Sequence, residues 1–324
     1  MRIAVAGSIA TDHLLTFDGR FAESVLPDQL TRISLSFLAS DLQVRRGGAG
    51  ANIAFGMAVL GERPVLVGSV GADVADYLQW LDEHGVDLAG VRISETRATA
   101  RFTCTTDQDH CQIATFYPGA MSEASAIDIG AFAPLDLVVI APDDPGAMAR
   151  HTTTCRELGI PFAADPSQQL AFLDGPPIRQ LVEGARYLFT NDYEAGLTCE
   201  KTGWSAQDIL SRVGTWITTH GTDGIVVRRA GSPDLRVPVA PAERLAEPTG
   251  VGDAFRAGFL SATAWGLDLE RACQVGALLA THVVETVGTQ EYVYAPDRFL
   301  DRLTRAYGAA AAADVGPHLS ARVG

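Results

Sequence analysis

Short runs of β-branched and apolar residues alternate with longer helical patterns along most of this chain. Amphipathic segments such as Asp73–His84 and Pro145–Leu158 separate the apolar runs. Apolar strands separated by helices are typical of a parallel sheet that is buried on both faces. The sequence therefore predicts an α/β fold with a mainly parallel central sheet and helices on both faces. The candidate strands are Arg2–Gly7, Pro64–Gly71, Leu135–Pro142, Ile160–Pro166, Arg186–Asn191 and Thr215–Gly221.

Two regions interrupt this alternation. The first contains the strand-like patches Leu30–Phe37 and Ser40–Arg46, and the second, Arg97–Pro118, has the pattern of a hairpin with a polar tip. We expect one large α/β domain over residues 1–324, with a small β-sheet lid formed by segments near 14–46 and 92–119. Ligands of parallel sheets bind beyond the carboxyl ends of the strands, beneath such a lid.

The composition is that of an ordinary globular protein, with 47% apolar and 20% charged residues. The 39 acidic and 25 basic residues give a formal net charge of −14, which argues against a nucleic-acid partner. Five scattered cysteines without a C-x-x-C pair argue against a disulfide framework or a structural zinc site. No apolar run approaches the roughly 20 residues of a membrane span, and the first residues do not resemble a signal peptide. We expect a cytoplasmic protein without a membrane partner.

The stretch "EPTGVGDAFRAGF", Glu247–Phe259, joins a glycine turn to a helical pattern. Pro248 and the glycines oppose helix up to about Gly252, and the residues after it have helical spacing. The backbone N–H groups of Gly250, Val251 and Gly252 would then converge beside the positive end of the helix, forming an anion hole suited to a phosphoryl group. Asp253 would lie in the first helical turn, within reach of that group. Alternatively, Asp253 only stabilises the helix start and the glycines only form a turn.

Other phosphate and nucleotide motifs are missing. The chain has no G-x-x-x-x-G-K-[ST] loop, which excludes a P-loop enzyme, and "VGSVG" does not match the G-x-S-x-G elbow of hydrolases. Gly48 and Gly50 lack the third glycine of a dinucleotide fingerprint, and lid-like sequence precedes them. These observations argue against a Rossmann dehydrogenase.

Two long motifs, "GGAGANIAFGMAVLG" and "PTGVGDAFRAGF", resemble the two signatures of the ribokinase-like carbohydrate and purine kinases, in the same order. Further stretches, including "GSIATDHL", "ARFTCTTD", "FAADPSQQLA" and "YLFTNDYE", are similar to the bacterial ribokinase-like adenosine kinases. The resemblance covers essentially the whole chain and includes the lid. It implies a ribokinase-like fold and an ATP-dependent kinase that converts adenosine to AMP in purine salvage.

The resemblance also implies catalytic roles. Asp253 corresponds to the general base that deprotonates the attacking sugar hydroxyl, and the amides of Gly250, Val251 and Gly252 to the group that stabilises the transferring phosphoryl. Phosphoryl transfer depends mainly on such positioning and electrostatics. Asn191 and Glu194 match the family's N-x-x-E, which holds Mg²⁺ largely through water. Taken alone, N-x-x-E is also the pattern of a helix start.

On the substrate side, Asp12 and Asn52 match residues that bind ribose hydroxyls in the family, a role that suits a carboxylate facing a vicinal diol. Gly48 would let the sugar approach the backbone closely. Ser8 and Ser36 are further candidate contacts, or else ordinary strand-end and cap residues. Gln168 and Gln169 are expected to read the adenine edge by paired donor and acceptor bonds.

Phe102 and Phe116 lie on the two arms of the lid hairpin. If the hairpin loop is odd and centred on Asp109, the two rings face each other across the ladder. They could then stack on a purine, a contact worth roughly 1–3 kcal/mol per base. The alternative is that both rings pack the lid or a dimer contact.

For the nucleotide, "TTHGTDG" matches a family turn beside ATP, and "ETVGTQE" is expected near the ATP adenine or a monovalent cation. Glu247 replaces the aspartate that is usual in the family near this cation, so we expect an altered K⁺ dependence. The residues expected to bind the nucleotide are Asn191, Thr219, Gly221, Gly224, Gly252 and Gly288.

Three alternatives remain open from the sequence. A sugar kinase or another nucleoside kinase would share Asp253 and the anion hole. A non-catalytic nucleotide-binding regulator is a second possibility, which the intact motifs oppose. A structural role for the lid is the third and would add to catalysis: the edge strands of the lid need covering, so we expect a homodimer that pairs through the lid.

Overall fold

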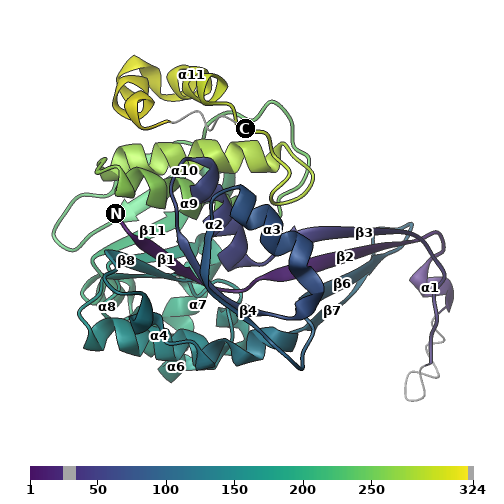
Figure 1. The fold of residues 1–324 in the computed structure, drawn as a ribbon. Helices are drawn as coiled ribbons and strands as arrows, with labels where there is room; N and C mark the ends of the chain where they lie inside the picture. Colours follow the sequence, from purple (N-terminus) through teal and green to yellow (C-terminus); the bar gives the residue numbers. More distant parts are fainter. Residues whose placement is uncertain (25–33, 320–324) are drawn as a thin grey trace.

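The computed structural model of the chain describes residues 1–24 and 34–319 (Figure 1). Its main sheet has the strand order β13-β12-β11-β10-β9-β8-β1-β4-β5. Every pairing from β5 to β11 is parallel, and β12 and β13 are added antiparallel at one edge. The strands are β1 (Ile3–Ala6), β4 (Val65–Val70), β5 (Asp87–Ile93), β8 (Leu137–Ile140), β9 (Phe162–Ala164), β10 (Tyr187–Asn191), β11 (Thr215–Thr219), β12 (Ile225–Arg228) and β13 (Leu235–Val237).

The predicted parallel sheet and all six of its predicted strands are confirmed. Successive residues of a strand point to opposite faces, and here both faces are buried: Val5 packs in one core, and Ala4 and Ala6 pack in the other. This two-sided burial explains why the central strands are apolar throughout. The sequence analysis missed β5, β12 and β13. β5 and β13 are the edge strands, where part of each strand is exposed and the apolar signal is weaker. β12 lies next to β13 and is only four residues long.

Helices cover both faces of the sheet (Figure 1). Those of one face are α2 (Ala49–Val59), α3 (Ala75–Glu83), α9 (Val251–Ala264) and α10 (Leu269–Val284), with α11 (Pro296–Val315) outside α10. Those of the other are α4 (Pro145–Glu157), α6 (Gly175–Val182), α7 (Asp192–Thr202) and α8 (Ala206–Leu210). Short helices are α1 (Phe21–Ser24), α5 (Gln169–Phe172) and the 3₁₀ turns Ala72–Val74, Gly119–Ala126, Ile129–Phe132, Gly221–Asp223 and Gly316–His318.

The two amphipathic segments predicted between the strands are the helices α3 and α4. The side chain of Asp144 caps α4 by accepting from the Ala147 N–H, and Pro145 occupies the first turn, where its missing N–H costs nothing. The C-terminal helix α11 is interrupted at Gly308, which has a φ of 87°. None of the helices within residues 1–24 and 34–319 is both long and apolar enough to cross a membrane.

A second sheet projects from the main one (Figure 1). Its strands lie in the order β3 (Ala39–Gly47), β2 (Ala10–Phe17), β6 (Ala100–Thr106) and β7 (Gln112–Tyr117). The patch Ser40–Arg46 and the hairpin Arg97–Pro118 are therefore strands, as the sequence predicts. Of the patch Leu30–Phe37, residues 30–33 lie outside the described residues, and residues 34–37 form no strand. This small sheet is the predicted lid.

Candidate active site

A cavity of about 880 Å³ lies between the carboxyl edge of the main sheet and the small sheet. Its wall includes residues directly after β1, β8, β9, β10 and β11, where a parallel sheet binds its ligands. Most of the predicted site residues meet there: Ser8, Asp12, Gly48, Asn52, Phe102, Phe116, Gln168, Gln169, Asn191, Glu194, Thr219, Gly221, Gly250, Gly252, Asp253 and Gly288.

Three other predicted site residues, all within the described ranges, are not on this wall. Ser36 is exposed in the segment before β3. Val251 packs its side chain against the core beneath α9. Gly224 has a φ of 95°, and a Cβ there would approach the carbonyl oxygen of Val237 to 2.4 Å. Glycine is therefore required at this position by the pairing of β12 with β13.

The glycine turn before α9 has the predicted form, with a small shift. Gly250 is the N-cap residue, with a left-handed φ of 77°, and the helix begins at Val251. Asp253 therefore lies in the first turn, where backbone N–H groups have no intrahelical partner. The N–H of Val251 is an exception to the predicted set, because it makes a long bond of 3.4 Å to the carbonyl of Pro248. The turn presents amides and a carboxylate to the same cavity.

The Asp253 carboxylate accepts a hydrogen bond of 2.9 Å from Asn52 Nδ2. Burial raises the pKa of Asp253, and the Asn52 bond and the nearby Arg256 charge oppose that rise. Arg256 forms a buried pair with Asp165, with two N···O distances of 2.5 Å, and it donates to the carbonyl of Gly252 at 3.0 Å. A Cβ on Gly252 would lie 2.9 Å from Arg256 Nη1. This arginine, which the sequence analysis missed, therefore packs directly behind the glycine turn.

A row of four residues crosses the small sheet and faces the cavity. Arg45, Asp12, Phe102 and Phe116 are successive partners in the register of β3, β2, β6 and β7. Directly paired residues lie on the same face of a sheet, so one face carries a guanidinium, a carboxylate and two rings side by side. The predicted pairing of Phe102 with Phe116 is confirmed.

The Asp12 carboxylate in this row has a raised pKa. Burial and the nearby Glu247 raise its pKa to about 6, and the Arg45 guanidinium limits the rise. Gly48, where the chain leaves β3 for α2, has a φ of 94°, and a Cβ there would come within 2.5 Å of the Ser8 carbonyl. Glycine is thus required for the small sheet to join the body at this point.

Asn191 and Glu194 form a capping box at the start of α7. Asn191 Oδ1 accepts from the Glu194 N–H at 2.7 Å, and Glu194 Oε2 accepts from the Asn191 N–H at 2.8 Å. The helix-start alternative is therefore real, yet both side chains also line the cavity. Among the described residues no three acidic, histidine or cysteine side chains cluster as metal ligands. The donor set fits a hydrated Mg²⁺ held by one carboxylate, an amide and phosphate oxygens.

The two glutamines lie after β9. Gln169 Nε2 donates to the Asp143 carbonyl at 2.9 Å, and Gln168 Oε1 accepts from the Ser167 hydroxyl at 3.1 Å. Asp143 itself is buried on the cavity wall, and burial raises its pKa to about 8. The Gln169 side chain thus has a structural partner beside the cavity.

Glu247 is held from both sides. Its Oε2 accepts from Arg45 Nη1 at 2.7 Å and from the Gly288 N–H at 3.0 Å. This carboxylate ties the small sheet to the turn of Gly288, in the segment predicted to lie near the nucleotide or a monovalent cation.

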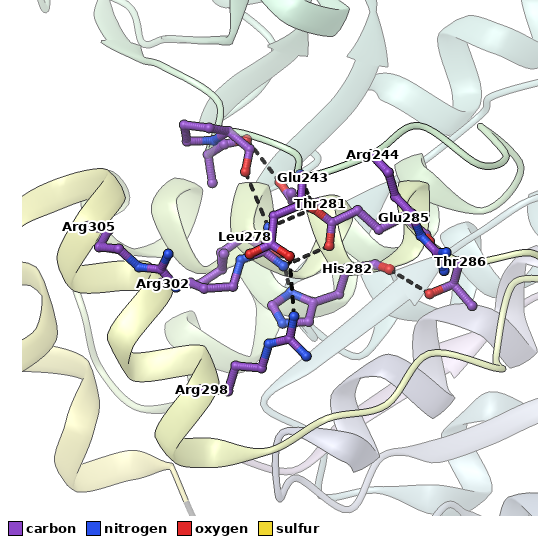
Figure 2. Close-up of polar contacts among 12 residues, drawn as sticks. Glu243, Arg244, Leu278, Thr281, His282, Glu285, Thr286, Arg298, Arg302 and Arg305 are labelled. Atoms are coloured by element: carbon purple, nitrogen blue, oxygen red, sulfur yellow. Dashed lines mark hydrogen bonds and ion pairs between the residues drawn. The ribbon is translucent and has the colours of Figure 1, made fainter.

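The loop that leads to Glu247 is anchored by the end of α10 and by α11. Figure 2 shows Arg302 and Arg298 on α11 pointing toward Glu285 and Glu243. Arg302 makes two bonds to the Glu285 carboxylate, at 2.7 and 2.8 Å, and Glu285 accepts from the Glu243 N–H at 2.6 Å. Burial alone would raise the pKa of Glu285, but these donors hold it below the usual value. The network fixes the approach to the glycine turn.

Comparison with known proteins identifies the fold of this site. The model of the pfkB family of carbohydrate kinases matches residues 23–296, which include the glycine turn and the Asn52 helix. The chain belongs to the pfkB kinase family. Members transfer a phosphoryl group to a hydroxyl acceptor, so the chain is a ribokinase-like phosphotransferase.

The similar relatives include nucleoside kinases. A nucleoside kinase of Methanocaldococcus jannaschii is 30% identical over 261 residues, covering 80% of this chain and 85% of that protein. The ligand-free nucleoside kinase of Burkholderia thailandensis superposes with a TM-score of 0.84 at 37% identity, over 93% of this chain and 99% of that one. The ribokinase of Bacillus subtilis is 26% identical over 89% of this chain and 94% of that protein.

Proposed function

We propose that this kinase is an adenosine kinase, which transfers the γ-phosphoryl group of ATP to the 5′-hydroxyl of adenosine and yields AMP and ADP. The observation that carries the proposal is the meeting of two features in one cavity. The glycine turn with Asp253 supplies a base beside backbone N–H groups, and the Phe102–Phe116 pair supplies an aromatic surface. The first suits phosphoryl transfer and the second suits a nucleobase.

The reaction follows from the placement of these groups. Asp253 takes the proton of the 5′-hydroxyl as its oxygen bonds to phosphorus, and the bond from phosphorus to the β-phosphate oxygen breaks, so ADP leaves with the electron pair. The free N–H groups of the first turn of α9 stabilise charge on the transferring oxygens. Mg²⁺, when bound, neutralises phosphate charge, and Asn191 and Glu194 are the residues that would hold it, mostly through water.

The sugar and the base have separate contacts. Asp12 and the second N–H of Asn52 Nδ2 suit the ribose 2′- and 3′-hydroxyls, since a carboxylate can accept from both members of a diol. Phe102 and Phe116 would stack on the purine, and Gln168 and Gln169 lie on the same wall to read its edge. The Burkholderia kinase that resembles this chain has been solved in complex with inosine, which supports a purine nucleoside as acceptor.

A ribokinase-type sugar kinase is the second candidate. Asp12 and Asn52 would serve free ribose equally well, and the chain is similar over most of its length to the Bacillus subtilis ribokinase. The contacts proposed for the base, the Phe102–Phe116 pair and the two glutamines, distinguish the two acceptors.

The test is ADP release from ATP and Mg²⁺ with a panel of adenosine, inosine, guanosine and ribose. We expect adenosine to give the highest kcat/KM. Asp253→Asn should lower turnover roughly 10²–10⁴-fold, the usual effect of removing a general base, while nucleoside binding survives. Near-normal turnover of this variant would remove the role of Asp253. No turnover with any acceptor would favour a non-catalytic regulator.

A further inference from the structure

A chain of buried hydrogen bonds joins the candidate base to the point where the small sheet meets the body. Asn52 Nδ2 donates to Asp253, and Asn52 Oδ1 accepts from Gln290 Nε2 at 2.9 Å. Gln290 Nε2 also donates to the Tyr77 hydroxyl at 2.6 Å, which donates to the carbonyl of Gly47 at 2.9 Å. Gln290 is 1% exposed and Tyr77 is 5% exposed, so water does not compete for these groups.

The donor-to-acceptor direction of this series of hydrogen bonds is fixed at the Gly47 end. A carbonyl oxygen can only accept, so the Tyr77 hydroxyl must donate to Gly47 and accept from Gln290. Gln290 must therefore turn its NH₂ group inward, and its second N–H meets Asn52 Oδ1. Asn52 is then left with its own NH₂ group facing Asp253.

This direction matters for a base. An Asn52 N–H stabilises the ionised Asp253 carboxylate, whereas a protonated carboxyl would prefer to face an amide oxygen. The Thr289 hydroxyl lies 3.0 Å from both Asn52 Oδ1 and the Arg46 carbonyl oxygen, and its single proton can be donated to only one of them. The Gln290 N–H is therefore the donor that fixes the orientation of the Asn52 amide. Five elements take part, namely the end of β3, α2, α3, α9 and the loop after α10.

We propose that Gln290 and Tyr77 are positioning residues that hold the Asn52 amide in the orientation required by the ionised base, and so couple Asp253 to the junction of the small sheet. The inference rests on the proposed role of Asp253 in phosphoryl transfer. Neither residue touches the reacting atoms, so their effect must pass through Asn52 and Asp253.

A double-mutant cycle tests this dependence. Gln290→Leu should lower kcat about tenfold, the effect of one misaligned hydrogen bond, with the KM for ATP unchanged. In an Asp253→Ala background, which has no carboxylate to orient, the same substitution should change the residual turnover less than twofold. Gln274→Leu is the matched control, because Gln274 is also a buried glutamine, on α10, bonded to Arg271 and Glu270. It should leave kcat unchanged.

Tyr77→Phe is the second variant, and it removes a single oxygen atom, the hydroxyl that joins Gln290 to Gly47. It should lower kcat several-fold in the wild-type background and leave the residual turnover unchanged in the Asp253→Ala background. Equal losses in both backgrounds, or a Gln290→Leu kcat within twofold of the wild type, would overturn the proposal. If Gln290→Leu fails to fold, the Tyr77→Phe cycle decides alone.

The cycle is run with whichever hydroxyl compound the wild type phosphorylates best. A preference for ribose would then overturn the adenosine proposal and leave this inference testable. If no acceptor reacts, the proposed function has failed, and ¹³C titration of the Asp253 carboxyl decides. Asn52 on α2, Arg256 on α9, Glu194 on α7 and Asp165 after β9 face that carboxyl. Gln290→Leu should then shift its titration to higher pH, and an unchanged titration would overturn the inference.

Discussion

Asp12 illustrates how a single carboxylate is tuned by its neighbours. It lies between Arg45 and Phe102 in the row that faces the cavity, and Glu247 is near enough to add negative charge. Burial and Glu247 together raise its pKa to about 6. A nucleoside diol requires the ionised form, because a protonated carboxyl loses acceptor capacity.

This predicts a pH dependence of nucleoside binding. As the pH falls through about 6, the free protein takes up a proton at Asp12, so adenosine affinity should fall about tenfold per unit below that pH. Isothermal titration calorimetry between pH 5 and 8 measures this. Asp12→Asn should bind roughly 10–100-fold more weakly at pH 8 and lose the dependence, since charged hydrogen bonds are the stronger kind. Asp253→Asn is the control and should retain it; a flat profile in the wild type would contradict the assignment.

A second prediction concerns a single residue, Glu247, and the dependence of turnover on K⁺. Its carboxylate is occupied by Arg45 and by the Gly288 N–H, so a cation near it would compete with a guanidinium 2.7 Å away. We expect turnover to depend less on K⁺ than in relatives that carry aspartate. Activity in K⁺, Na⁺ and K⁺-free buffer measures this, and Glu247→Asp should increase the dependence. Strong K⁺ activation of the wild type would refute it.

At the level of elements, we expect the hairpin of β6 and β7 to determine whether the acceptor is a nucleoside or a sugar. Phe102 and Phe116 pair directly, and Phe116 is 50% exposed, a large aromatic area for a residue that lines a cavity. Phe102→Ala and Phe116→Ala should each lower kcat/KM for adenosine about 10–100-fold, the worth of one stacked base, and change it less than twofold for ribose. Steady-state assays with both acceptors measure the ratio.

Ile113→Ala is the matched control for these substitutions. Ile113 is also on β7 and partly exposed, but it lies an odd number of residues from Phe116 and so points to the opposite face. It should leave both acceptors unaffected. Equal losses for adenosine and ribose in the phenylalanine variants would instead assign the rings to packing of the small sheet.

The same elements show what the sequence could predict. The register of the hairpin could be predicted from the centre of its loop, Asp109, because residues equally distant from the tip pair across the two strands. Side chains alternate between the two faces of a strand, so the same register also determines which residues share a face. The strand ends and the glycine turn were also readable, because local sequence determines them.

Contacts between distant segments were not readable. Arg45 and Glu247 are 202 positions apart, and Asn52 and Gln290 are 238 apart, so no local pattern joins them. Arg256 was missed for a different reason. An arginine in an amphipathic helix is normally solvated, and only its buried partner Asp165 reveals that it supports the turn.

For the whole molecule, the outer face of the small sheet is a surface that exposes several large apolar side chains. Leu42 and Val44 on β3 and Ile113 on β7 are 54%, 57% and 45% exposed. Their rows across the sheet contain only apolar residues, threonines and His13, although the chain carries a net charge of −14. Because these two rows contain no acidic residue, they avoid the self-repulsion of the remaining surface, and symmetric pairing of two copies would bury them.

We therefore expect a homodimer that pairs through this outer face. Sedimentation equilibrium should give twice the 34.3 kDa of one chain, and Val44→Glu with Ile113→Glu should give the monomer, because dimerisation would bury like charges at a shared interface. Leu158→Glu is the control: this leucine is 56% exposed at the end of α4, on the body, and the change should leave the dimer intact. A wild type that sediments at 34.3 kDa, or a double variant that remains dimeric, would show that the small sheet is not the interface.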